Sequence, residues 1–278
     1  MRAIRGGIPE LPSNPELMSG RVTAPLISAK KATGEKVVCI TAYDFPTAKL
    51  ADEAGVDLIL VGDSLGSVLF GFANTIPVTM EMMLHHVSAA SRGVTRALVI
   101  ADLPFGSYQA SVEDAVNASV ALMKAGAGGV KLEGCYPEAI HEIRRAGIPV
   151  MGHVGMTPQS YHAFGGHKIQ GKGDAGSQVI EDAVAVVEAG AFSVVLELIP
   201  AELSREVTQR IAVPTIGIGA GVHCDGQVQV FHDMLGYADK SFKHVKRYAE
   251  VGAQIRSAIQ GYAEEVRRGD FPGAEQSF

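Results

Sequence analysis

The chain has 278 residues, of which 47% are hydrophobic, and its formal net charge is −6. It contains no sustained basic run, so nucleic acid is not an expected partner, and no apolar stretch reaches the roughly 18 residues of a membrane span. The cysteines Cys39, Cys135 and Cys224 are widely spaced and offer neither a disulfide framework nor a zinc-binding spacing, which indicates a reducing, cytoplasmic compartment.

The expected elements begin with an arm and a capping helix. Residues 1–22 are rich in Gly and Pro and are expected to form an N-terminal arm, and residues 23–31 a short helix that caps the floor of the domain. Eight short apolar runs then predict strands at residues 37–43, 58–62, 97–101, 129–132, 150–154, 193–198, 215–218 and 227–232. Helices are expected at residues 48–54, 80–90, 111–125 and 178–189, after Pro137, after Pro200, and finally at residues 243–268.

This alternation favours a single α/β domain, a (β/α)8 TIM barrel over residues 23–273, with residues 274–278 as a C-terminal tail. Barrels of about 250 residues are commonly one domain. The run at residues 221–226 is too short for a helix. The sequence therefore leaves open whether the seventh crossover is minimal or the last strand is misplaced.

Several expected strands end in a charged or titratable residue. In DLILVGDSLG (residues 57–66), four apolar residues are followed by Gly62, Asp63 and Ser64. The same layout recurs at four further strands and places there Asp102, Lys131, Glu133, His153 and Glu197. Side chains alternate along a strand, so Asp63 is expected to share an inward face with Val61. Because barrel enzymes carry their sites at the carboxyl ends of the strands, we expect these polar groups to meet at the barrel mouth.

Acids that face one another need a cation or shared protons. Two unit charges about 4 Å apart repel by about 4 kcal/mol at an effective dielectric constant of about 20. Carboxylate oxygens select Mg²⁺ or Mn²⁺ over zinc, and Asp63, Asp102 and Glu133 come from three adjacent strands, so they are predicted to share one metal ion. The alternative is that each acid caps a helix or pairs with a nearby base.

The other polar candidates also have two interpretations. Lys131 would bind an anionic substrate group or form a Schiff base. Alternatively, it forms a buried ion pair with a neighbouring acid. Ser64 would hydrogen-bond the substrate, or it is a loop hydroxyl. His153 would orient the substrate or an acid, or it is a core imidazole. His167 belongs to a polar, Gly-rich loop at residues 156–173. This loop would act as a lid, or it is a solvated loop without a function.

Eight ordered motifs cover nearly the whole chain: ITAYD (40–44), VGDSLG (61–66), ADLPFGSY (101–108), VKLEG (130–134), GHVGMTPQS (152–160), FGGHKIQGKG (164–173), LELIP (196–200) and IGIGAG (216–221). In this order they closely resemble the ketopantoate hydroxymethyltransferase family. The resemblance implies a barrel of the phosphoenolpyruvate/pyruvate type. It also implies Mg²⁺-dependent transfer of a hydroxymethyl group from 5,10-methylenetetrahydrofolate to 3-methyl-2-oxobutanoate, giving 2-dehydropantoate for pantothenate synthesis.

Residue roles follow from the same resemblance. Asp63, Asp102 and Glu133 match the metal-binding acids, and Asp63, Ser64, Asp102 and Lys131 match the contacts to the keto acid. Glu197 matches the proton acceptor. The family also implies a homodecamer of two pentameric rings. The chemistry agrees, because a metal-stabilised enolate and a carboxylate base would together make the C3 proton removable.

Three other hypotheses remain. A Mg²⁺-dependent carbon–carbon lyase would cleave a 2-oxo acid without folate. A Schiff-base aldolase would be trapped through Lys131 by borohydride. A barrel that has lost activity would show no metal-dependent turnover, although the presence of all four acids and the lysine argues against it.

Overall fold

The structure is a computed structural model that describes residues 20–237 and 242–278. The arm predicted over residues 1–22 therefore lies outside the described residues, except at its last three positions. Within the described ranges, no helix is both long enough and apolar enough to cross a membrane.

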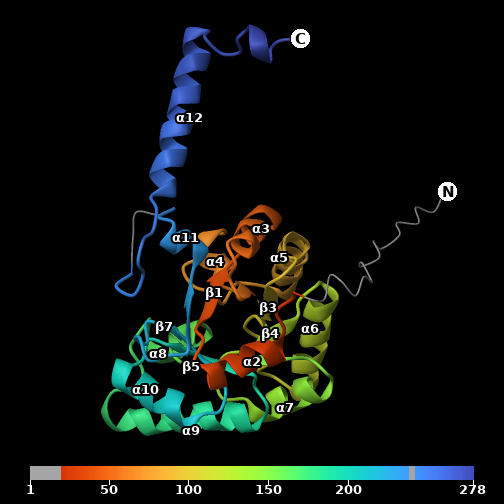
Figure 1. Ribbon diagram of the computed structural model, residues 1–278, viewed down its shortest axis with the longest axis vertical. Helices are drawn as coiled ribbons and strands as arrows, with labels where there is room; N and C mark the ends of the chain where they lie inside the picture. Colours follow the sequence, from red (N-terminus) through yellow and green to blue (C-terminus); the bar gives the residue numbers. More distant parts are fainter. Residues whose placement is uncertain (1–19, 238–241) are drawn as a thin grey trace, which may run out of the picture.

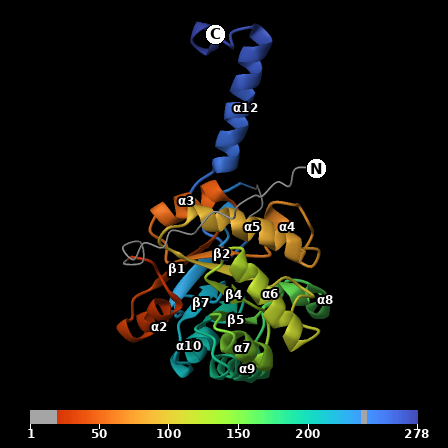
Figure 2. The ribbon, with the colours of Figure 1, turned by 90° about the vertical axis from the view of Figure 1, so that its right-hand side faces the viewer.

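Eight parallel strands form one closed barrel, in which each strand pairs with its neighbours in the sequence and β8 pairs with β1 (Figure 1, Figure 2). The strands are β1 (Val37–Thr41), β2 (Leu58–Val61), β3 (Leu98–Asp102), β4 (Gly129–Lys131), β5 (Val150–Gly155), β6 (Ser193–Glu197), β7 (Thr215–Ile218) and β8 (Gly226–Gln229). The predicted (β/α)8 barrel is confirmed.

Helices lie around this barrel. They are α2 (Ala24–Thr33), α3 (Phe45–Glu53), α4 (Leu65–Val68), α5 (Met80–Gly93), α6 (Val112–Lys124), α7 (Pro137–Arg145), α8 (Tyr161–Phe164), α9 (Gly176–Glu188), α10 (Ala201–Arg210), α11 (Phe231–Met234) and α12 (Val251–Arg268). Short 3-10 turns occur at Pro158–Ser160, Gly173–Ala175 and Ala274–Gln276. Ser111 caps the start of α6, because Asp114 N donates to Ser111 Oγ at 3.0 Å.

Strand side chains alternate between two cores. In β2, Leu58 and Leu60 join the core inside the barrel, whereas Ile59 and Val61 join the core between the strands and the surrounding helices. All four are buried, which explains why the strand is an uninterrupted apolar run.

Helix α2 closes the floor of the barrel, as predicted. Its Ile27 is fully buried in the inner core. Lys30 Nζ lies 3.0 Å from Asp57 Oδ1, and Lys31 Nζ lies 2.7 Å from Asp225 Oδ2. Asp57 and Asp225 directly precede β2 and β8, so these pairs hold the helix against the amino ends of the strands.

The structure settles the crossover between β7 and β8. Residues 219–225 form no helix there, so the crossover is minimal and the last strand is real. No helix of this crossover covers the outer face of the barrel, where Val38 of β1 is 52% exposed and Val222 is 80% exposed. A cavity of about 530 Å³ lies at this face, lined in part by Val38, Val222 and Gln227.

The C-terminal part differs from the prediction in two places. Strand β8 ends at Gln229 rather than at residue 232, because Phe231–Met234 form helix α11. The last helix begins at Val251 rather than near residue 243. Tyr248 N donates to Met234 O and Val251 N to Leu235 O, so this segment bonds to the end of α11 before a helix begins.

Helix α12 projects away from the barrel (Figure 1, Figure 2). None of its residues is buried. Its exposed apolar residues are Ile255, Ile259, Tyr262 and Val266. Their spacings of four, three and four residues place them on one stripe of the helix, which is the pattern of a helix that packs against a partner.

Candidate active site

A cavity of about 220 Å³ opens at the carboxyl ends of the strands. All seven residues singled out from the sequence line it: Asp63, Ser64, Asp102, Lys131, Glu133, His153 and Glu197. They come from five strands or the turns that follow them, so the closed barrel brings residues together that are far apart in the sequence.

Three of the acids are almost completely buried. Asp63 and Asp102 are each 3% exposed and Glu133 is 4% exposed. Asp102 follows Ile100 of the inner core by two residues, and Glu133 follows Lys131 of β4 by two residues, so strand alternation turns both acids inward as predicted.

Asp63 reaches the cavity by a different route, and the prediction that it shares an inward face with Val61 is wrong. Val61 lies in the outer core, and the chain leaves β2 at Gly62 to turn into α4. A Cβ atom at Gly62 would lie 2.9 Å from Ser64 Oγ and 3.3 Å from Asp102 Oδ2. The absence of this side chain lets Asp63 N donate to Asp102 Oδ2 at 3.0 Å.

Two basic side chains lie among the acids. Lys131 Nζ is 2.8 Å from Asp102 Oδ1 and 3.8 Å from Glu133 Oε1. His153 lies between two glutamates, with Nδ1 3.6 Å from Glu133 Oε1 and Nε2 3.4 Å from Glu197 Oε2. Lys131 is thus held as an ammonium ion by carboxylates, an arrangement that favours binding of an anion over Schiff-base chemistry.

This crowding shifts the pKa values in opposite directions. Burial, followed by the charges of Glu133 and Asp102, raises the pKa of Asp63 well above its ordinary value. Burial also raises the pKa of Asp102, although Lys131 opposes this.

The pKa values of Glu133 and His153 are determined mainly by their neighbours, which outweigh the effect of burial. Burial acts to raise the pKa of Glu133, but the interaction with His153, the charge of Lys131 and the backbone N–H of Gln159 together outweigh it and lower the pKa. Burial and the charge of Lys131, whose Nζ lies 3.3 Å from His153 Nδ1, act to lower the pKa of His153, but its contacts with Glu133 and Glu197 raise it to about 9. His153 is therefore expected to be a cation near neutral pH.

Glu197 stands at the edge of this group, with a side chain that is 15% exposed. Apolar side chains line the cavity beside it: Leu60, Val195, Ile218, Val228 and Val230. The cavity is therefore lined by both charged and apolar side chains.

Hydroxyl groups also line the cavity, among them those of Ser64 and Thr75. Ser64 Oγ is hydrogen-bonded to Tyr43 OH at 2.9 Å. Thr75 is 7% exposed and its Oγ1 has no hydrogen-bond partner among the described residues. Such a buried hydroxyl is available to a bound polar group.

The acids do not form a complete metal cage. Within residues 20–237 and 242–278, no group of three or more His, Cys, Asp or Glu side chains is arranged to hold a metal ion. The donors around the cavity are nonetheless carboxylate oxygens, and Mg²⁺ is commonly held by one or two carboxylates together with water and substrate oxygens. This donor set fits a Mg²⁺ ion whose remaining ligands come from a bound substrate and solvent.

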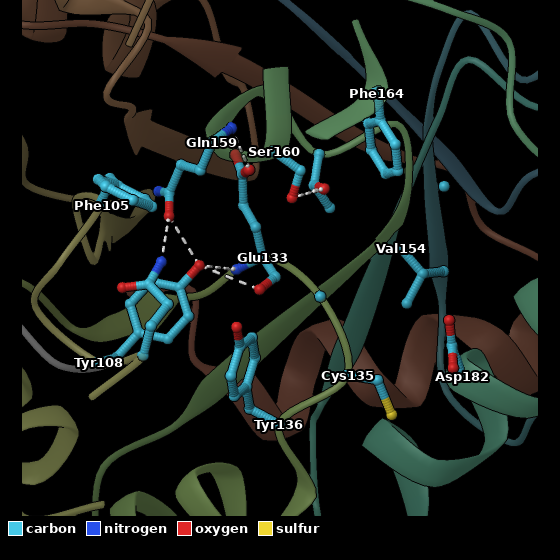
Figure 3. Close-up of a pocket in the computed structure, with 14 residues that line it drawn as sticks. Phe105, Tyr108, Glu133, Cys135, Tyr136, Val154, Gln159, Ser160, Phe164 and Asp182 are labelled. Carbon is cyan, nitrogen blue, oxygen red and sulfur yellow. Dashed lines mark hydrogen bonds between the residues drawn. The ribbon is translucent and has the colours of Figure 1, made fainter. Parts of the chain in front are cut away.

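Sequence reasoning missed two residues that connect these groups. Gln159 and Tyr108 belong to quoted motifs but received no role. Gln159 Nε2 donates to Asp63 Oδ2 at 2.9 Å, and Tyr108 OH donates to Gln159 Oε1 at 2.7 Å. Both face a second cavity of about 300 Å³ that adjoins Glu133 (Figure 3). Both residues lie in loops, where no periodicity marks a side chain as buried.

His167 is the member of the predicted lid that lines the central cavity. Among the described residues, the lining of this cavity does not include His162 or Lys168, and both are exposed. The loop thus contributes one imidazole to the cavity.

A closed parallel barrel with buried acids, a lysine and a histidine at the carboxyl ends of its strands defines a TIM-barrel enzyme. The model of the ketopantoate hydroxymethyltransferase family matches residues 21–274. The chain belongs to this family and is a transferase.

Its relatives are similar over nearly their whole lengths. The 3-methyl-2-oxobutanoate hydroxymethyltransferase of Syntrophus aciditrophicus is 53% identical over 263 residues, which cover 93% of this chain and 97% of the relative. The enzyme of the same name from Moorella thermoacetica is 52% identical over 263 residues, covering 93% and 98%.

Solved structures share the fold at low identity. Phosphonopyruvate hydrolase has a TM-score of 0.61 at 15% identity, covering 92% of this chain and 91% of that chain. 2,3-Dimethylmalate lyase, a member of the PEP mutase/isocitrate lyase superfamily, has a TM-score of 0.58 at 17% identity, covering 92% of each chain. These similarities show that the chain shares the barrel fold of these structures.

Proposed function

We propose that this enzyme transfers a hydroxymethyl group from 5,10-methylenetetrahydrofolate to 3-methyl-2-oxobutanoate and releases 2-dehydropantoate. The observation that carries the proposal is the convergence of Glu197, Lys131 and the three buried acids on one cavity, in a chain of this family. The charged groups of the lining suit the 2-oxo and carboxylate oxygens of the keto acid, and the apolar groups suit its isopropyl group.

We assign the Mg²⁺ site to Asp63, Asp102 and Glu133. The crowding of Asp63 with Asp102 and Glu133 supports this assignment, because burial and the charges of these two acids raise the pKa of Asp63, and a bound cation would relieve their mutual repulsion. When bound, Mg²⁺ would supply Lewis-acid polarisation of the 2-oxo group. A structure of phosphonopyruvate hydrolase, which has the same fold, holds oxalate and Mg²⁺.

Lys131 and the hydroxyls would bind and orient the keto acid. The ammonium group of Lys131 offers positive charge at the buried end of the cavity, and Ser64 offers a hydroxyl beside Asp63. An anionic substrate bound there would have its apolar group near Val195 and Ile218. In this orientation C3 of the substrate would lie toward Glu197.

Glu197 would remove the C3 proton as the general base. His153 Nε2, 3.4 Å from Glu197 Oε2, fixes the carboxylate and stabilises its charge. The C3 carbanion then forms a carbon–carbon bond with the methylene carbon supplied by the folate. Water supplies the hydroxyl group to that carbon, both of its bonds to the folate nitrogens break, and tetrahydrofolate leaves with the proton taken from C3.

The direct test is incubation with 3-methyl-2-oxobutanoate, 5,10-methylenetetrahydrofolate and Mg²⁺, with product mass analysis, in the presence and absence of a chelator. Formation of 2-dehydropantoate that stops with the chelator supports the proposal. Cleavage of a 2-oxo acid without folate would support the lyase instead, and borohydride trapping on Lys131 would support the aldolase.

We also propose that the chain self-associates, as the decamer implied by the resemblance requires. Helix α12 carries an apolar stripe with Ile259 60% exposed and Tyr262 57% exposed, and the outer face near Val38 is uncovered. Among the described residues, the exposed stripe of α12 and the exposed outer face near Val38 are apolar surfaces that a second copy could cover.

Light scattering tests the self-association. Ile259→Asp places a charge on the stripe and is expected to lower the particle mass. Ser257→Asp, on the opposite side of the same helix, is the control and should leave the mass unchanged. Equal masses for both variants would argue against this role of α12.

A further inference from the structure

Gln159 makes contact with two of the three acids at the barrel mouth. It lies in the 3-10 turn Pro158–Ser160 after β5 and is 5% exposed. Its side-chain Nε2 donates to Asp63 Oδ2 and to Leu103 O, each at 2.9 Å. Its backbone N donates to Glu133 Oε2 at 2.9 Å. One residue thus spans the ends of β2, β3 and β4.

The amide of Gln159 is fixed in this orientation by its oxygen. Gln159 Oε1 accepts hydrogen bonds from Tyr108 OH at 2.7 Å and from Gln109 Nε2 at 3.0 Å (Figure 3). Both hydrogens of the NH₂ group are also used. A flipped amide would place its oxygen against Asp63 and Leu103 O, so the network allows a single orientation.

The donor groups of Gln159 hold the acids without neutralising them. The cations in contact with the acids in the described part of the chain are Lys131 and His153, which pair with Asp102, Glu133 and Glu197. Asp63 receives a neutral donor instead, so within the described residues no cationic side chain is paired with its carboxylate. A lysine in place of Gln159 would form an ion pair with the Asp63 carboxylate and compete with a metal ion for it.

Gln159 also belongs to the loop that borders the cavity. The same loop carries His167, which lines the central cavity. Its far end is held by the hydrogen bond from Gln170 N to Leu198 O at 2.9 Å, next to Glu197. Leu198 has φ 45°, the sole positive φ of a non-glycine residue in residues 20–237 and 242–278. The loop is therefore attached to the site at both ends.

We propose that Gln159 is a positioning residue that sets the spacing of Asp63 and Glu133 for a divalent cation and links occupancy of that site to the loop at residues 156–173. This inference rests on the proposed metal dependence. An ion that fixes Asp63 also fixes the partner of the Gln159 amide, so ion binding should restrict the loop.

The first test measures ion affinity directly, with Mn²⁺ as the probe, on the purified full-length chain. Gln159→Met removes the donors to Asp63 but keeps the backbone donor to Glu133, and should weaken Mn²⁺ binding about tenfold, the scale of lost outer-shell contacts. Gln109→Met is the control, because it loses a bond to the same Oε1 without touching an acid, and should bind Mn²⁺ like the wild type. If Gln159→Met does not fold, Gln159→Asn keeps the amide but shortens its reach and should show the same loss.

The second test measures the link to the loop by limited trypsin digestion at the exposed residues Lys168 and Lys172. Mn²⁺ should slow cleavage of the wild type and of Gln109→Met several-fold, and should not slow cleavage of Gln159→Met. A purely structural role would lower the melting temperature of Gln159→Met while leaving both ion affinity and ion-dependent protection unchanged, and that result would overturn the inference.

Neither measurement requires folate, so the inference and the proposed function can fail separately. Loss of Mn²⁺ affinity and protection in Gln159→Met supports the inference even if the wild type makes no 2-dehydropantoate. Unchanged affinity and protection in Gln159→Met overturns it even if the wild type is fully active.

Discussion

The two ends of the barrel use buried carboxylates in opposite ways. At the floor, Asp52 accepts hydrogen bonds from the backbone nitrogens of Thr95, Arg96 and Ala97 at 2.8, 3.1 and 2.6 Å. The N–H groups lower its pKa even though burial acts to raise it. At the mouth, Asp63 lies among other acids, and burial and those charges raise its pKa.

The acids at the floor contribute to stability, whereas the acids at the mouth are arranged for chemistry. Floor acids lie beside the amino ends of the strands, where each has donors or a lysine of its own, as in the pair of Lys30 with Asp57. Mouth acids share Lys131 and His153 and are left with excess negative charge. We therefore expect substitutions at the floor to change the free energy of unfolding and substitutions at the mouth to change catalysis or ion binding.

The largest effect is expected for Glu197→Gln at the mouth. Loss of the base should lower kcat by about 10³-fold, within the range typical of general bases. Exchange of the C3 proton of 3-methyl-2-oxobutanoate in D₂O, followed by NMR, should stop, while Mn²⁺ binding should stay nearly intact. Unchanged exchange would remove Glu197 as the base.

At the floor, Asp52→Asn should have the reverse profile. An Asn offers one acceptor oxygen and turns an NH₂ group toward backbone donors, which leaves buried groups unpaired at a cost of about 2–3 kcal/mol. Urea unfolding should show this loss, and kcat should stay within twofold of the wild type. A large fall in kcat with unchanged stability would break the distinction between the two ends.

The contribution of Asp52 should depend on pH with a definite sign. Its pKa in the folded state lies below the ordinary value of 3.8, so its stabilisation is present above that value and is lost as pH falls through the folded pKa. The difference in unfolding free energy between wild type and Asp52→Asn should be constant near neutral pH and shrink below about pH 4. A difference that grows on acidification would contradict the assigned direction.

Much of the barrel could be predicted from the sequence because local patterns determine it. Both faces of a strand such as Leu58–Val61 are buried, so each strand is an apolar run, and strand alternation places Asp102, Glu133 and Glu197 at the mouth. The seven candidate residues do line one cavity, although their roles are proposals.

Other features depend on contacts between distant residues and have no local pattern. Gln159 bonds to Asp63 across 96 positions of the chain, and nothing in the loop sequence marks it as buried. The position of Asp63 follows from the turn at Gly62 rather than from strand alternation. The start of α12 depends on hydrogen bonds from residues 248 and 251 to the end of α11, which periodicity does not reveal.

The smallest expected effect is that of Asp63→Asn on the free energy of unfolding. It tests the difference between the two ends most sharply, because its sign is opposite to that of Asp52→Asn at the floor. In the ion-free protein, Asp63→Asn removes a charge that the folded state disfavours, while the Asn oxygen can still accept the hydrogen bond from Gln159. The variant should therefore be more stable than the wild type by about 1 kcal/mol near neutral pH, the scale of other relieved strains at functional sites. Because the folded pKa of Asp63 is raised, the wild type gains stability as pH falls through that pKa, and the difference should shrink on acidification.

Thermal unfolding with and without Mg²⁺ tests both points. The wild type should be stabilised by the ion and Asp63→Asn hardly at all, whereas a variant that is less stable than the wild type without the ion would show that Asp63 is a structural acid like Asp52.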